Sequence, residues 1–356
     1  MARIADRFNR RTIMAIMLAT WSIFTVACGL AQTFLQMALA RFGVGSGEAG
    51  IVPTSLSIIS DYYPAHQRGT ATAVFTAAIP IGVLVGFPMA GWLNDIIGWR
   101  WTFIVVGLPG VFLALSIRLL LIEPPRGHAD KLAVDNPPPP LRDVAKYLWH
   151  CKSYRNLVLG GAATGFGYAS VIQWTPSFLV RSFGMDTSEV GNWLALSIGL
   201  VGGTSTILSG WLADLLGKKD PRWYAWMPCA AMIALIPLGS LVYLTQTKIY
   251  ALIFLALPMA LYPIYLGPLS AMVQGLASVR MRATAAAISI LTANLLGLAL
   301  GPLIVGIISD MLSPKLGPEA LRYAILSVVV FGAVWGSIHW FAGSRTLRED
   351  LAANKP

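Results

Sequence analysis

Charged residues are scarce in this chain. Asp, Glu, Lys and Arg make up only 12% of its 356 residues, whereas hydrophobic residues make up 56%. A soluble domain carries about 25% charged residues, so this composition excludes an ordinary soluble protein. The few charges leave long uncharged stretches, such as 12–40 and 283–309. Because a membrane helix needs about 20 mainly apolar residues, the sequence predicts an all-α polytopic membrane protein.

Residues that support catalysis or metal binding are also few. The three cysteines, Cys28, Cys151 and Cys229, show neither metal nor disulfide spacing. The sequence contains no phosphate-binding loop, zinc motif or Ser/His/Asp set. It opens without the apolar core of a signal peptide. We therefore expect no enzyme, no metal and no cofactor.

Ten stretches are predicted to be membrane helices. The second is interrupted by Arg41 and Glu48, and the fourth contains one charge near its end. The stretches lie near residues 12–31, 34–60, 68–94, 100–122, 154–183, 188–216, 222–245, 248–275, 280–311 and 320–344.

The positive charges lie mainly on one side of these helices. Of the 26 Lys and Arg residues, 20 fall in the termini and in loops on the same side. Positive residues concentrate in cytoplasmic loops, so we expect an integral protein of the cell (inner) membrane with both termini cytoplasmic. The net charge of +10 then reflects topology and attraction to anionic membrane lipids rather than nucleic-acid binding.

A short phrase, Gly-x-x-x-Asp, recurs at the ends of apolar stretches. It occurs at 91–95, 210–214 and 306–310, and 2–6 has Ala in place of Gly. The copies are offset by 208 and 215 residues between the halves, as in a duplicated transporter. Aligned in this way, the second half is complete, with six spans. The first half lacks its first two spans, so we expect a truncated gene model, a fragment or a degenerate copy.

The chain is expected to have four parts. Residues 1–122 form a partial N-terminal bundle of four spans, and residues 154–344 form a C-terminal bundle of six. Residues 123–153 form a cytoplasmic linker with four consecutive prolines, followed by an amphipathic helix at the membrane surface. Residues 345–356 form a cytoplasmic tail.

Arg41 and Glu48 are the two charged residues expected in the membrane interior. Such charges suggest a functional site, and a separation of seven residues places both on one helix face, about 10 Å apart. A carboxylic acid removed from water favours its neutral form, which suits a proton carrier. Arg41 could pair with a phosphate or carboxylate of a substrate. The alternative is that both bond structurally to neighbouring helices.

Charged residues on the cytoplasmic side form a second candidate group. Asp6 and Asp214 follow spans, where the helix dipole disfavours an acid, and would be better placed against the start of a span in the other half. Such contacts would act as a conformational latch, although ordinary loop charges are the alternative. The candidates are Asp6, Arg7, Arg10, Arg68, Asp214, Lys218 and Arg282.

Polar side chains in the second half are candidates for the lining of a substrate cavity. The alternative for each is a bond to a neighbouring helix. They are Tyr168, Gln173, Tyr262, Tyr265 and Asn294.

The motifs resemble those of the major facilitator superfamily. Residues 210–219 are similar to its loop signature except at Leu215, and residues 4–11 are similar with Asn9 in place of Gly. The stretch from Arg41 to Pro53, together with 61–64, 98–100, 107–110, 123–127 and 219–224, is similar to the Spinster-like branch. The resemblance implies a fold of twelve spans in two pseudo-symmetric bundles, of which ten are present here, and alternating access. It also implies proton coupling at Glu48, a basic partner at Arg41 and lipid-like cargo.

We therefore expect a proton-coupled secondary transporter of an amphiphilic or organic-anion small molecule, acting as a monomer. Two alternatives stay open. One is a membrane binding or scaffold protein that no longer transports. The other is a membrane-embedded enzyme acting on lipids, which would need a nucleophile or metal set.

Overall fold

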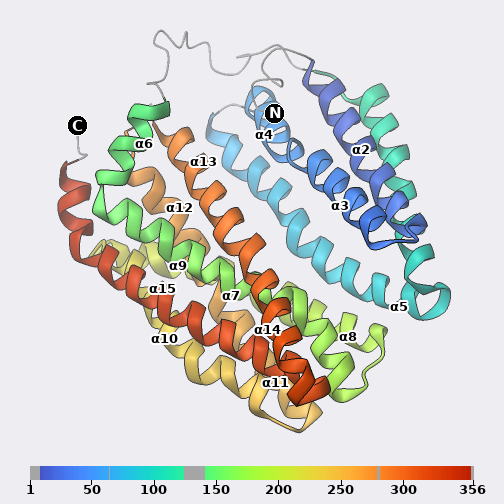
Figure 1. Ribbon diagram of the computed structural model, residues 1–356. Coiled ribbons are helices and arrows are strands. Elements are labelled where there is room, and N and C mark those ends of the chain that lie inside the picture. The colour runs from blue at the N-terminus through green and yellow to red at the C-terminus, as the bar shows by residue number, and fades with distance from the viewer. Residues whose placement is uncertain (1–8, 64, 124–140, 279–280, 354–356) are drawn as a thin grey trace. The chain divides into compact units, whose positions relative to one another are not determined.

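The chain divides into two compact units. The computed structural model describes residues 9–63, 65–123, 141–278 and 281–353, and these contain helices and loops but no strand. Unit 1 is Met1–Asp135 and unit 2 is Asn136–Pro356 (Figure 1). The boundary falls inside the segment expected to be a linker.

The described residues of unit 1 form four helices, and α2 packs against both α3 and α5. Asn9 caps α2 by accepting from the Thr12 N–H, and Thr33 and Gln36 form a capping box at the start of α3. The helices are α2 (Arg10–Leu30), α3 (Phe34–Glu48), α4 (Ile51–Tyr62) and α5 (Ala65–Leu120).

Two interruptions shape unit 1. The stretch 34–60, expected to be one helix, is divided at Ala49 and Gly50 into α3 and α4. The long α5 reverses at Gly98, whose φ of 76° is a left-handed conformation that glycine adopts without strain. Residues 65–97 and 99–120 therefore form two separate helical arms.

Unit 2 is built around α7. Its helices are α6 (Leu141–His150), α7 (Lys152–Phe183), α8 (Thr187–Leu194), α9 (Gly203–Gly217), α10 (Trp223–Leu244), α11 (Lys248–Leu261), α12 (Leu266–Gly275), α13 (Arg282–Thr292), α14 (Leu300–Leu316) and α15 (Ala320–Ala353). Among the described residues of unit 2, short segments of other helix types join four pairs of these helices. They are the π-helices η1 (Ala195–Gly202) and η3 (Ala293–Ala299) and the 3₁₀-helices η2 (Tyr262–Tyr265) and η4 (Gly317–Glu319).

Small residues on α7 let its neighbours approach closely. The Trp340 ring of α15 packs over Gly160, and its indole N–H donates to the Thr164 hydroxyl at 3.1 Å. Gly301 of α14 lies against the Phe166 carbonyl of α7. Helices in lipid associate through such small-residue contacts because no hydrophobic force drives them together.

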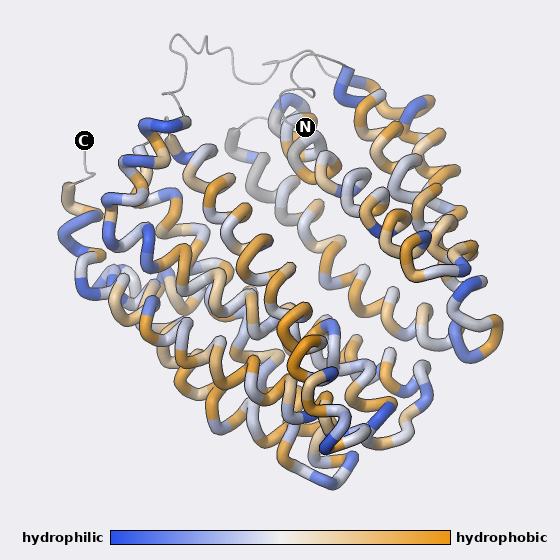
Figure 2. Tube along the Cα trace, viewed as in Figure 1, coloured by the Kyte–Doolittle hydropathy of each residue, from blue (hydrophilic) through white to orange (hydrophobic). Residues whose placement is uncertain are grey.

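The helices match those expected of a polytopic membrane protein. Among the described residues, six helices are long and apolar enough to cross a membrane: Arg10–Leu30, Val74–Leu120, Thr187–Gly217, Trp223–Leu244, Lys248–Gly275 and Thr284–Ala353. The second turns at Gly98 and the last at Gly317, so each is long enough for two spans. Hydrophobic residues follow the helices for most of their length (Figure 2). The all-α polytopic fold is therefore confirmed.

Two segments differ from what we expected. Helix α6 buries Val144 and Leu148 completely, and it packs against α7 and α13. Part of its apolar face therefore contacts protein, whereas Ala145 and Trp149 are exposed. Residues 345–353, expected as part of a tail, continue α15, where Leu347 is fully buried.

Candidate functional site

Arg41 and Glu48 lie on one exposed face of α3. The opposite face buries Ala40, Gly43 and Gly47, and a Cβ atom on Gly47 would lie 2.6 Å from the Trp21 backbone nitrogen of α2. Close packing of these small residues on α2 therefore turns the charged face of α3 away from α2. Both charged side chains are exposed.

The two charged groups differ in their contacts. The Arg41 guanidinium carbon lies 4.9 Å from the centroid of the Phe103 ring in the second arm of α5. Within the described residues, Arg41 makes no ion pair or hydrogen bond and Glu48 makes none with its side chain. Glu48 is the last residue of α3, beside the interruption at Ala49 and Gly50. The face therefore offers one cation and one carboxyl group whose side chains have no ion-pair or hydrogen-bond partner among the described residues.

A cleft lies between α2 and α3 in unit 1. It has a volume of about 480 Å³ and is lined by Phe24, Ala27, Leu30, Ala31, Gln32, Gln36, Leu39 and Ala40. The apolar lining comes from α2 and α3, and the two amides add hydrogen-bonding groups. Such a mixed surface can hold an apolar chain next to a polar group.

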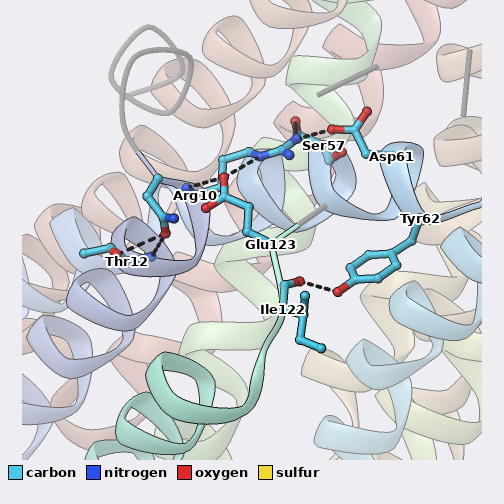
Figure 3. A network of polar contacts seen from close by, with 8 residues as sticks. Arg10, Thr12, Ser57, Asp61, Tyr62, Ile122 and Glu123 are labelled. Atoms are coloured by element: carbon cyan, nitrogen blue, oxygen red, sulfur yellow. Dashed lines mark hydrogen bonds and ion pairs between the residues drawn. The ribbon is translucent and has the colours of Figure 1, made fainter. Parts of the chain in front are cut away.

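A buried charge cluster ties together three segments of unit 1. The Arg10 guanidinium contacts the Asp61 carboxylate at 2.5 Å and donates from Nε to Glu123 at 3.3 Å (Figure 3). It also donates to the Ser57 hydroxyl at 3.0 Å, and Glu123 accepts from the Arg10 backbone N–H. Arg10 is only 3% exposed. The start of α2, the end of α4 and the segment after α5 therefore share one cation.

Two further contacts hold the segment after α5. The Tyr62 hydroxyl donates to the Ile122 carbonyl (Figure 3). The Arg11 guanidinium donates to the Leu121 carbonyl at 3.2 Å. Asp61 and Glu123 were assigned no role from the sequence. Both lie in motifs that resemble the Spinster-like branch, and this resemblance was the sequence feature that could have pointed to them.

The remaining latch candidates are described unevenly. Asp6 and Arg7 lie outside the described residues, and the side chain of Arg68 is not described. In unit 2, Asp214 accepts from the Tyr224 hydroxyl at 2.8 Å, and its carbonyl accepts from the Lys218 N–H at 3.3 Å. Arg282 donates from Nε to the Gln274 carbonyl at 3.2 Å.

The polar candidates of unit 2 fall into two sets. Gln173 and Asn294 are exposed, and Tyr168 is partly exposed. Tyr262 and Tyr265 are buried, and the Tyr262 hydroxyl lies against Gly167 of α7. The rings of Tyr168 and Tyr262 are 5.4 Å apart. The structure thus brings these two tyrosines together and leaves Gln173 and Asn294 accessible.

Another charged contact holds the end of α15. Arg348 donates to both Asp220 carboxylate oxygens, at 3.1 and 2.6 Å, and Arg222 also contacts this carboxylate. The hydrogen bonds from Arg222, and then those from Arg348, hold the pKa of Asp220 well below its usual value. A further carboxylate, Asp350, accepts from the Ser153 N–H at 2.8 Å at the start of α7.

These features define a helical membrane transporter. The pattern of the Major Facilitator Superfamily matches residues 1–302. The chain is 32% identical to an MFS-type efflux pump of Mycolicibacterium smegmatis, over 98% of this chain and 80% of that protein. It is 27% identical to Protein spinster homolog 1 of Mus musculus, over 98% of this chain and 70% of that protein.

A solved structure supports the same assignment. The crystal structure of a bacterial homolog of the human lysosomal transporter Spinster, inward-facing and unoccupied, matches with a TM-score of 0.88 and 28% identity. The match covers 98% of this chain and 86% of that chain. The chain therefore belongs to the major facilitator superfamily, in its Spinster-like branch, and is not an enzyme.

Proposed function

We propose that this protein is a proton-coupled secondary transporter of amphiphilic organic anions that works by alternating access. The observation that carries the proposal is the exposed face of α3, where Arg41 and Glu48 have no ion-pair partner among the described residues. An uncompensated guanidinium inside a membrane protein is costly. An anionic cargo would supply the missing charge.

Each charged group has a separate role in this proposal. Arg41 binds the phosphate or carboxylate of the cargo through its planar set of N–H donors. Glu48, the carboxyl group exposed on the same face of α3, takes up and releases the proton. Within unit 2, Tyr168, Gln173, Asn294, Tyr262 and Tyr265 are the further candidates for hydrogen bonds to cargo, and the Tyr262 ring packs against Tyr168.

The proposed cargo is at least partly apolar. The cleft between α2 and α3 has a largely apolar lining, and Arg41 supplies a cationic group elsewhere on α3. A cargo that suits both features joins an alkyl chain to an anionic head. Octyl phosphate has this chemistry, and octanol is its uncharged counterpart.

The charged contacts away from α3 serve conformational control in the same proposal. Asp6, Arg7, Arg68, Asp214, Lys218 and Arg282 form a latch on the side expected to be cytoplasmic, whereas Arg10, also a latch candidate from the sequence, is held in the buried cluster. The buried cluster around Arg10 would hold α2, α4 and the end of α5 together as one rigid body while the latch opens and closes. We further propose that the protein acts as a monomer in the cell (inner) membrane with both termini cytoplasmic.

Transport in liposomes tests the proposal. The purified chain is reconstituted, and uptake of radiolabelled octyl phosphate is measured with and without an imposed pH gradient. We expect uptake driven by the gradient in the unchanged protein and loss of that dependence in Glu48→Gln. Arg118→Gln is the control, because this exposed side chain of α5 makes no contact recorded in the described residues. A Glu48→Gln variant that keeps its full gradient dependence refutes the proton role.

Binding tests the role of Arg41 separately. Arg41→Ala should lose affinity for octyl phosphate by about tenfold or more, since a charge-assisted hydrogen bond contributes about 1.5–3 kcal/mol. Binding of octanol should stay unchanged. Equal affinity of the variant and the unchanged protein for octyl phosphate would remove Arg41 from the cargo site. Absence of both binding and uptake in the unchanged protein would refute the cargo class.

A further inference from the structure

The Phe103 ring lies at the exposed face of α3 but belongs to another helix. It stands five residues after the turn at Gly98, in the second arm of α5, and its centroid is 4.9 Å from the Arg41 guanidinium carbon. The ring is partly buried. This cation–π contact is the only interaction recorded for the Arg41 side chain among the described residues. Arg41 therefore rests on an aromatic surface rather than on a carboxylate.

The contact leaves the hydrogen-bonding capacity of Arg41 unused. A guanidinium carries five N–H donors in its plane, whereas a ring below it contacts the face of that plane. An ion pair with a protein carboxylate would occupy those donors and neutralise the charge. Stacking on Phe103 keeps both the charge and the donors available for an anion.

Phe103 is itself held by its neighbours. The Trp99 ring meets it edge-on, with centroids 6.2 Å apart and planes at 86°. The Arg100 guanidinium carbon lies 4.2 Å from the centroid of the Trp99 ring, and Arg100 donates to the Ala31 carbonyl at 3.4 Å. A chain of contacts therefore runs from the end of α2, through the turn after Gly98, to Phe103. The ring under Arg41 has a defined position.

We infer that Phe103 is a positioning residue that orients the Arg41 guanidinium for capture of an anionic cargo group. This inference rests on the proposed function of Arg41. A free arginine side chain loses rotamer freedom when it binds an anion, and a side chain already held in place loses less. Phe103 would therefore increase affinity without touching the cargo.

Nuclear magnetic resonance of the full chain in nanodiscs tests the contact without any ligand. Arginine is labelled with ¹⁵N, and the Arg41 Nε–H signal is assigned with Arg41→Lys. We expect ring-current displacement of this signal and restricted mobility in the unchanged protein and in Phe103→Trp. Phe103→Leu should lose the displacement and gain mobility. An Arg41 signal equally mobile in the unchanged protein and in Phe103→Leu overturns the inference.

Binding of octyl phosphate tests the consequence. Phe103→Leu should weaken binding about two- to tenfold, and Phe103→Trp, which offers a better cation–π surface, should restore it. Phe112→Leu is the control because that phenylalanine lies on the same arm of α5 and is 69% exposed. Unchanged affinity in Phe103→Leu contradicts positioning. Unchanged affinity in Arg41→Ala instead refutes the proposed function of Arg41. In that case the mobility of the Arg41 signal still decides whether Phe103 restrains the Arg41 side chain.

Discussion

The Arg10 guanidinium contacts the Asp61 carboxylate at 2.5 Å, although 51 residues separate them in the chain. Both residues are less than 10% exposed. Glu123 joins the pair from the segment after α5 (Figure 3). The contact thus fixes the start of α2 against the end of α4. A buried pair of this kind destabilises a protein strongly when one partner is removed, because the other charge stays behind in a site of low polarity.

Arg10→Ala should therefore destabilise the protein by about 3–5 kcal/mol. The expected measurement is a lower midpoint of thermal unfolding for the purified chain in detergent. Arg118→Ala provides the matched control, since that arginine is exposed in the same unit. If the two variants unfold at the same temperature, the cluster contributes nothing to stability.

The carboxylate of Asp350 is predicted to stabilise the start of α7. It accepts from the Ser153 N–H and from the Cys151 thiol, and α7 has no side-chain cap of its own. Anions at a helix N-terminus are stabilising, so Asp350→Asn should cost about 0.5–2 kcal/mol. Glu349→Gln, an exposed neighbour on α15, should cost much less.

The rate of thiol labelling at Cys151 provides a second measurement on Asp350→Asn. Burial and, to a smaller extent, the nearby Asp350 charge together raise the pKa of Cys151 to about 11. The thiolate is the reactive form, so Cys151 should react slowly with a maleimide near neutral pH. The reaction should become faster in Asp350→Asn, and an unchanged rate would argue against the contact between the two side chains.

The helices could be predicted from the sequence, whereas their breaks and long-range partners could not. Seven-residue spacing placed Arg41 and Glu48 on one face because helix geometry fixes that relationship. The interruption after Glu48 and the π-helices η1 and η3 have no comparable pattern in the sequence. The apolar face of α6 was visible, but amphipathicity does not reveal whether lipid or protein covers it.

The sequence also did not show which residues contact one another across the fold. Arg10 was singled out as a latch residue, and Asp61 and Glu123 stood in quoted motifs, yet the sequence gives no distance between them. Their contact depends on how α2, α4 and α5 pack. The same holds for Phe103, whose position under Arg41 follows from the reversal at Gly98.

Gly301→Ala should destabilise unit 2 through a steric clash. A Cβ atom at Gly301 would lie 2.3 Å from the Phe166 carbonyl oxygen and 2.6 Å from the Ser170 hydroxyl. The carbonyl belongs to the backbone of α7 and cannot rotate away, so we expect a cost of about 1–3 kcal/mol. Gly210→Ala is the control, because a Cβ there meets nothing within 4 Å. Equal unfolding temperatures for the two variants would show that α7 and α14 can separate at no cost.

The contact of Asp220 with Arg222 and Arg348 should make stability depend on pH. Because these arginines hold the pKa of Asp220 below its value in the unfolded chain, the carboxylate stabilises the folded protein above about pH 4. This contribution is lost as the pH falls further and the carboxylate takes up a proton. Arg348 is 56% exposed in its side chain, so the contribution is modest, about 0.5–1 kcal/mol.

Thermal unfolding of Asp220→Asn at several pH values checks this expectation. The variant should unfold at a lower temperature than the unchanged protein near pH 7, and the difference should shrink as the pH falls below about 4. Asp186→Asn serves as the control, because Asp186 is exposed and its side chain makes no contact recorded in the described residues. A difference that stays constant across the whole pH range would show that the charge of Asp220 has no part in holding the end of α15.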